Sequence, residues 1–121
     1  ANTVHNPYYK RMTFNEYQKK ALETAIFNKD PLMDKTIWAM GISGEAGEVL
    51  EKWKKIVAYK DGIITDEDIA EIKKELGDVL WYVALLAHSL ELDLDDVVEL
   101  NVEKLASRKA RGVQKGQGDN R

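Results

Sequence analysis

Two pairs of carboxylates in this chain have a spacing that suits metal binding. Glu45 and Glu48 are three residues apart, and so are Glu75 and Asp78. If each pair lies on a helix, its two side chains share one face of that helix. The two pairs would then direct carboxylate oxygens toward a common point. Such a set of oxygens is suited to bind a hard divalent cation.

Each acid pair also encloses a glycine, Gly47 in the first pair and Gly77 in the second. A glycine inside a helix costs roughly 1 kcal/mol of stability relative to alanine. A compensating role is therefore expected, either a close approach of two helices or room for a ligand.

Capping signals and apolar spacing predict helices and no strands. Thr13 and Glu16 match a capping box, and Thr65 stands before a run of acids that favours a first helical turn. The expected helices cover residues 14–28, 32–59, a segment that follows Thr65, and 94–110, with Gly112 ending the last one. We therefore expect an all-α, four-helix bundle-like fold with a short N-terminal arm over residues 1–12 and a mobile tail after Gly112.

The helix after Thr65 carries apolar residues three or four positions apart, which predicts a buried face. These residues are Ile69, Ile72, Leu76, Val79, Val83, Leu86 and Leu90. Because the turn at Gly62 is short, this helix and the one before it should form an antiparallel hairpin. The two acid pairs lie at similar distances from Gly62, so all four carboxylates should meet at one height along the hairpin.

Length and composition limit the classes of protein. The chain has 121 residues, a net charge of −3, two histidines and no cysteine. One domain over residues 1–121, with its core at about 13–111, is expected at this length. The lack of cysteine excludes disulfides, zinc thiolate sites and a cysteine nucleophile.

The charge pattern and hydropathy of the chain argue against a nucleic-acid or membrane partner. No basic patch resembles a nucleic-acid footprint. No apolar run reaches the roughly 20 residues of a membrane span, and no secretory leader opens the chain, so a cytoplasmic location is expected.

The acid pairs and a downstream segment resemble the MazG family of all-α nucleoside triphosphate pyrophosphohydrolases over about residues 13–111. Glu45-x-x-Glu48 and Glu75-x-x-Asp78 match four positions of the family motif, which is written Glu-Glu-x-x-Glu followed by Glu-x-x-Asp. Gly44 stands at the first position of that motif, so this chain lacks one acid of the family pattern. The segment from 101 to 108 is similar to the Asn-x-x-Lys-Leu-x-x-Arg segment of several relatives.

The resemblance implies an activity and roles for individual residues. It implies hydrolysis of a (d)NTP to a (d)NMP and pyrophosphate, in the service of nucleotide pool cleaning. Oxygen ligands without thiolate or imidazole suit Mg²⁺, with Mn²⁺ as an alternative cofactor. The implied catalytic and metal-binding residues are Glu45, Glu48, Glu75 and Asp78, and the implied substrate-binding residues are Lys55, Tyr82, Asn101, Lys104 and Arg108.

Other interpretations of the same residues stay open at this point. Acids three residues apart are common on solvated helix faces, and Lys104 and Arg108 also suit the C-terminal end of a helix dipole. A non-catalytic helical oligomerisation or interaction module is the alternative function. A carboxylate-bridged di-iron bundle is disfavoured, because neither histidine follows a glutamate by three residues.

The sequence also predicts a homo-oligomer. Trp81, Tyr82 and Leu85 lie away from the main apolar stripe of their helix and are expected to leave apolar surface exposed on one short bundle. Small MazG-like relatives are dimers or tetramers, and the resemblance favours a tetramer here over a dimer.

Overall fold

A computed structural model describes residues 11–28 and 30–121, and these residues form four helices and no strand. The helices are α1 (Phe14–Glu23), α2 (Pro31–Lys60), α3 (Asp66–Ser89) and α4 (Leu94–Arg111). The all-α prediction is therefore confirmed. Most of the predicted arm over 1–12 lies outside the described residues. None of the helices in the described ranges combines the length and the apolar character that a membrane crossing requires.

The helix ends follow the local signals in the sequence. Thr13 and Thr65 each close a capping box, with Glu16 and Asp68 as the reciprocal partners. Gly112 ends α4 in the left-handed conformation, with φ at 70°.

The first helix is shorter than predicted: it ends at Glu23 and not near residue 28. The Thr24 hydroxyl donates to the Ala21 carbonyl at 2.8 Å, which satisfies an acceptor of the last turn. Four residues later the Asn28 amide donates to the buried carboxylate of Asp34 at 3.0 Å, so the chain is drawn back toward α2.

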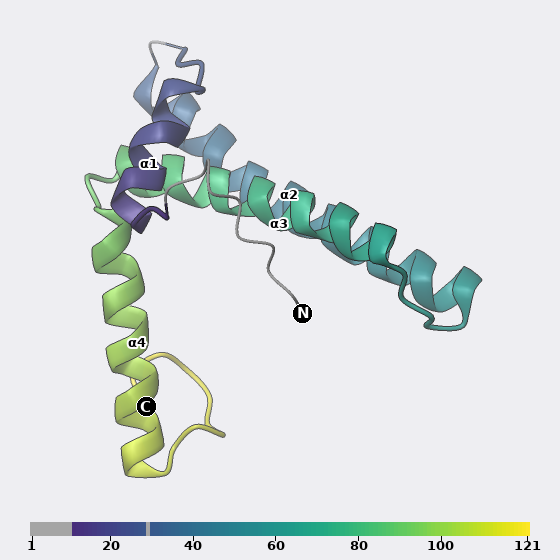
Figure 1. The fold of residues 1–121 in the computed structure, drawn as a ribbon. Helices are drawn as coiled ribbons and strands as arrows, with labels where there is room; N and C mark the ends of the chain where they lie inside the picture. The colour runs from purple at the N-terminus through teal and green to yellow at the C-terminus, as the bar shows by residue number, and fades with distance from the viewer. Residues whose placement is uncertain (1–10, 29) are drawn as a thin grey trace.

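Helices α2 and α3 form a long antiparallel hairpin, as predicted (Figure 1). The turn uses left-handed conformations at Asp61 and Gly62, with φ at 53° and 76°. Lys60 and Asp68 form an ion pair that joins the two helices beside the turn.

The buried core occupies one end of this hairpin, where α1 crosses it. Its members come from all four helices: Ala21, Trp38, Ala84, Leu85, Ala87 and Leu94. The Trp38 ring lies edge-on to Trp81, with ring centroids 5.7 Å apart, and tilted to Tyr82 at 6.2 Å. Packing is thus densest at the end of the hairpin farthest from its turn.

One prediction about burial on α3 holds only in part, since Ile72, Val79, Val83 and Leu86 of the predicted stripe are half-buried, and a second is wrong. Ile69, Leu76 and Leu90 of the predicted buried stripe are exposed, Leu76 by 51%. Leu85, expected to lie on an exposed face, is fully buried. The physical reason is that α1 is short and covers only the final turns of α3, so the buried face of α3 is the one that meets α1 and Trp38 there.

Helix α4 points away from the hairpin (Figure 1). Among the described residues it contacts α1 and α3 and makes no contact with α2. The buried Gln18 of α1 fixes this junction, because its amide donates to the Ala84 and Leu92 carbonyls and accepts from the Leu94 amide. The four helices therefore form an open arrangement in a single chain.

Candidate metal centre

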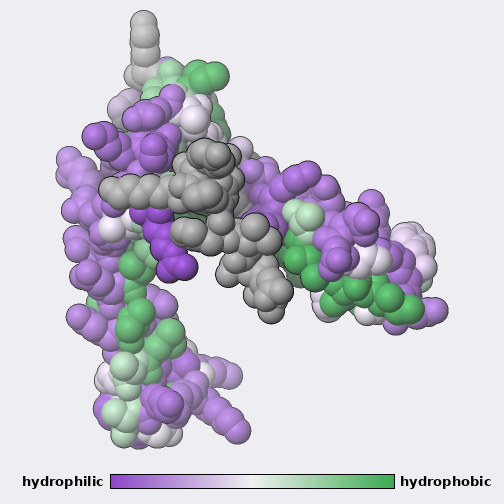
Figure 2. All heavy atoms as spheres, in the orientation of Figure 1, coloured by the Kyte–Doolittle hydropathy of each residue, from purple (hydrophilic) through white to green (hydrophobic). Residues whose placement is uncertain are grey.

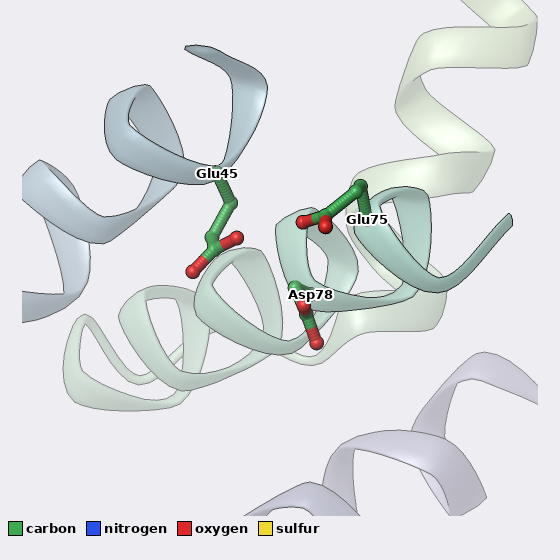
Figure 3. Close-up of side chains that lie close together, drawn as sticks. All are labelled: Glu45, Glu75 and Asp78. Atoms are coloured by element: carbon green, nitrogen blue, oxygen red, sulfur yellow. The ribbon is translucent and has the colours of Figure 1, made fainter. Parts of the chain in front are cut away.

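Three of the four predicted acids converge between α2 and α3 (Figure 3). Glu45 comes from α2, and Glu75 and Asp78 come from α3. One carboxylate oxygen of each lies within 4.8 Å of the others. The helical spacing of three residues aligns Glu75 with Asp78, and the antiparallel pairing of the helices brings Glu45 to the same height.

The crowding of these acids changes the ionisation of Glu45. Loss of hydration, followed by the negative charges of Asp78 and Glu75, raises the pKa of Glu45 above its ordinary value. Lys52, two turns after Glu45 on α2, offsets part of the charge, because its ammonium lies 3.7 Å from both Glu75 and Glu71. The centre is therefore an acidic group with one lysine at its edge.

Glu48 lies outside the group of three. Its side chain is exposed, and its charge makes the smallest contribution to the raised pKa of Glu45. Glu48 is thus near enough to act on Glu45 electrostatically, while its oxygens do not join those of the other three acids.

The glycines beside the acids face open space in this chain. Apart from the neighbouring residues and the nearby backbone of its own helix, a Cβ added at Gly44, Gly47 or Gly77 would meet no atom of the described residues within 4 Å. Close packing inside the chain therefore does not explain these glycines, and room for a ligand or for another copy of the chain remains as their expected role.

Tyr82, one helical turn after Asp78 on α3, packs against the backbone of α2 at Gly41. Its ring lies where a Cβ of Gly41 would stand, so this glycine is the one that a close approach requires. Tyr82 also stacks edge-on with Trp81 at 5.0 Å. The predicted substrate contact of Tyr82 stays a prediction, and the structure assigns its ring to aromatic packing beside the core.

Tyr17 of α1 is a neighbour of the centre that the sequence did not indicate. Burial and, secondly, the charge of Asp78 raise the pKa of its phenol, so Tyr17 lies within electrostatic reach of that acid. The sequence gives no sign of this proximity, because nothing local shows which part of α3 the first helix crosses.

The predicted substrate-binding residues Lys55, Asn101, Lys104 and Arg108 are not gathered around the acids of the same chain. Lys55 lies toward the hairpin turn, 3.8 Å from Glu51, beside a cavity of about 150 Å³. Asn101, Lys104 and Arg108 lie on α4, which does not contact α2 among the described residues. Lys104 and Arg108 instead contact Asp119 in the segment after α4.

The sequence of the centre has relatives among known proteins. A family model described as the MazG nucleotide pyrophosphohydrolase domain matches residues 35–113, a span that holds both acid pairs and the segment from Asn101 to Arg108. The chain belongs to the MazG family. The Gene 37 protein of Mycobacterium phage L5 is similar to this MazG chain, with 48% identity over 109 residues, or 87% of this chain and 96% of that protein. No solved structure matches the chain significantly.

The donor set of this MazG centre fits a hard cation. All ligand atoms are carboxylate oxygens, and Mg²⁺ and Mn²⁺ prefer such ligands to nitrogen or sulfur. Two Mg–O bonds span at most about 4.2 Å, so oxygens within 4.8 Å of one another need only small side-chain rotations to reach one ion. Glu45, Glu75 and Asp78 are therefore suited to hold it.

Proposed function

We propose that this protein hydrolyses nucleoside triphosphates, deoxy forms included, to nucleoside monophosphate and pyrophosphate with Mg²⁺ as cofactor. The observation that supports this most is the convergence of Glu45, Glu75 and Asp78 from two helices in a chain of the MazG family. Family membership also suggests a role in cleaning the nucleotide pool of the cytoplasm.

The residues divide the chemistry between them. Glu45, Glu75 and Asp78 would hold the metal, which when bound supplies a Lewis acid for the triphosphate and an activated water. Glu48, whose side chain lies outside this group, can accept the proton of the attacking water. The water attacks the α-phosphorus, the α–β bridge breaks, and pyrophosphate leaves.

The negative charge on the leaving pyrophosphate needs cations, and α4 carries them. Lys104 and Arg108 share a face because they are four residues apart, and Asn101 precedes them by one turn. Because α4 does not contact α2 within the described part of one chain, these groups would reach the acids from another copy. We therefore propose a homo-oligomer, with a tetramer favoured over a dimer. We also propose that residues 1–121 form a single domain.

A non-catalytic interaction module is the second candidate. The exposed apolar side chains on α2, α3 and α4 support this candidate, because surfaces of this kind are typical of protein interfaces. The two functions differ in what they require of the acids, since a purely structural module should tolerate neutral residues at all four positions.

A panel of ribonucleoside and deoxyribonucleoside triphosphates, incubated with Mg²⁺ and resolved by ion-exchange chromatography, tests the proposal. We expect monophosphate and pyrophosphate as products. We also expect Glu45→Gln and Glu75→Gln to lose at least about 100-fold in turnover, as removal of a strong electrostatic contribution to a transition state does. Glu67→Gln, which removes an exposed acid elsewhere on α3, is the matched control. Diphosphate and orthophosphate as products, or full activity in both centre variants, would overturn the proposal.

A further inference from the structure

The segment after α4 turns back and places a carboxylate on the two cations of that helix. The Lys104 ammonium lies 3.1 Å from Asp119 Oδ1, and the Arg108 guanidinium lies 3.4 Å from the same oxygen. Arg108 Nη2 also donates to the Asp119 carbonyl at 2.8 Å and to the Gly118 carbonyl at 3.3 Å. One residue of the tail thus occupies both cations that the proposed function assigns to phosphate.

The tail holds this position through its own closed loop. Gly112 and Gly118 take left-handed conformations that reverse the chain, with φ at 70° and 82°. The Arg121 guanidinium donates to the Val113 and Gln114 carbonyls, each at 3.0 Å, and so ties the end of the loop to its start. The position of Asp119 therefore follows from a defined turn and not from its side chain alone.

The contact with Asp119 leaves the Arg108 guanidinium incompletely hydrogen-bonded. Arg108 is only 5% exposed, and its Nε has no hydrogen-bond partner among the described residues. Asp119 contacts Lys104 and Arg108 through one oxygen, and its side chain is 83% exposed. An arginine fork binds an anion best through two parallel hydrogen bonds, and a phosphate group offers more oxygens than this carboxylate presents.

We propose that the segment 112–121 is an autoinhibitory latch, in which Asp119 competes with a phosphate group for Lys104 and Arg108. A triphosphate displaces the carboxylate, and the tail then leaves α4. This inference rests on the proposed function only in assigning phosphate to the two cations of α4. It adds that the cationic face is closed by the chain itself until a polyphosphate opens it.

Two variants open the latch by different physical means. Asp119→Asn removes the competing charge. Gly118→Ala keeps that charge and strains the left-handed turn, where an added Cβ meets no atom within 4 Å of it among the described residues. Glu103→Gln is the control, since it removes one negative charge from an exposed position on the same helix.

The test is calorimetric binding of inorganic tripolyphosphate, without divalent metal, to the whole protein. We expect both latch variants to bind about two- to fivefold more tightly than the wild type, the range expected for loss of an ion pair whose carboxylate is exposed. Glu103→Gln should bind as the wild type does. The latch is overturned if Asp119→Asn gains no more than Glu103→Gln, if Gly118→Ala gains nothing, or if none of the proteins binds tripolyphosphate.

Trypsin cleavage after Lys115 supplies a readout that does not depend on activity. Tripolyphosphate should speed release of the peptide 116–121 from the wild type, whereas Asp119→Asn should release it quickly without ligand. An unchanged or slower release from the wild type would contradict the latch. Hydrolysis that persists with equal kinetic constants in all variants overturns the latch alone, whereas absent hydrolysis with an intact tripolyphosphate response overturns the proposed function alone.

Discussion

At the scale of single residues, the metal centre is a balance of like charges. Glu45 is partly desolvated and faces Asp78 and Glu75, and this environment raises its pKa. Asp78 makes the largest charge contribution to that shift, and it acts on Tyr17 as well. A divalent cation would turn this repulsion into attraction, so the acids should couple metal binding to the stability of the fold.

Asp78→Asn should separate a metal site from a solvated acidic face. The substitution removes a repelling charge and a ligand together, so the metal-free variant should melt at or above the temperature of the metal-free wild type. Mg²⁺ stabilises a protein that binds it only when folded, by about 2.7 kcal/mol at a free concentration of 100 times Kd. The variant should lose most of that gain. Melting curves with and without Mg²⁺ measure both effects.

The control for this experiment is Glu67→Gln, which removes an exposed acid from the first turn of α3. It should retain the response of the wild type to Mg²⁺. If Asp78→Asn also retained that response and the full turnover, Asp78 would belong to a solvated face.

At the scale of elements, the α2–α3 hairpin positions the centre. An ion pair, in addition to the helix caps, stabilises its turn. The Asp68 carboxylate accepts hydrogen bonds from the Lys60 ammonium and from the Thr65 amide. These bonds, with that of Lys60 the stronger influence, lower the pKa of Asp68 from 3.8 to about 2. Because Asp68 belongs to α3 and Lys60 to α2, this pair joins both helices beside the turn.

Asp68→Asn should remove a pH-dependent part of the free energy of unfolding. A carboxylate whose folded pKa lies below its unfolded value stabilises the fold above the unfolded value, and that stabilisation is lost as pH falls through the folded value. The wild type should therefore exceed the variant in stability at neutral pH. The difference should shrink as pH falls from about 4 toward about 2.

Urea unfolding at a series of pH values, at one protein concentration, measures this window. Asp66→Asn changes an acid of the same helical turn whose side chain has no ion-pair partner in the described ranges. The difference in free energy of unfolding between Asp66→Asn and the wild type should vary less over the same pH range. A constant difference for Asp68→Asn would mean that the Lys60 pair does not contribute to stability.

At the scale of the whole molecule, more large apolar side chains are exposed than are buried in the core of the described chain. The core lies at one end of the hairpin, and apolar side chains gather on the far part of the hairpin and along α4 (Figure 2). They include Leu50 and Tyr59 of α2 and Leu100 and Val102 of α4. Surfaces of this kind mark protein interfaces.

Substitution of exposed apolar residues should therefore change assembly and leave folding intact. Leu50→Glu and Leu100→Glu replace side chains that are 68% and 66% exposed in the single chain. We expect light scattering to show a tetramer for the wild type at micromolar concentration and smaller species for both variants. Ile26→Glu, in the connection before α2, is the control and should keep the mass of the wild type. A monomeric wild type would contradict the prediction.

The amino-acid sequence was enough to predict the four helices, apart from the end of α1, and the register of the acids. Caps such as Thr13, Thr65 and Gly112 act over three or four residues, so the chain around each one is enough to set a helix end. The register of Glu45 against Glu75 was also predictable. A short turn leaves two long helices one antiparallel arrangement, and equal distances from Gly62 then set equal heights.

Which helix faces are covered could not be predicted from the sequence, because it depends on how the helices pack against one another. Apolar periodicity shows that Leu76 and Leu85 lie on different sides of α3, but it does not show which side another helix reaches. That choice depends on the short α1 and on the direction of α4, which the Gln18 junction fixes across more than 60 residues of sequence. The contact of Asp119 with Arg108 could not be predicted for the same reason. It requires the chain to reverse after α4, and no local spacing shows where the reversed segment will lie.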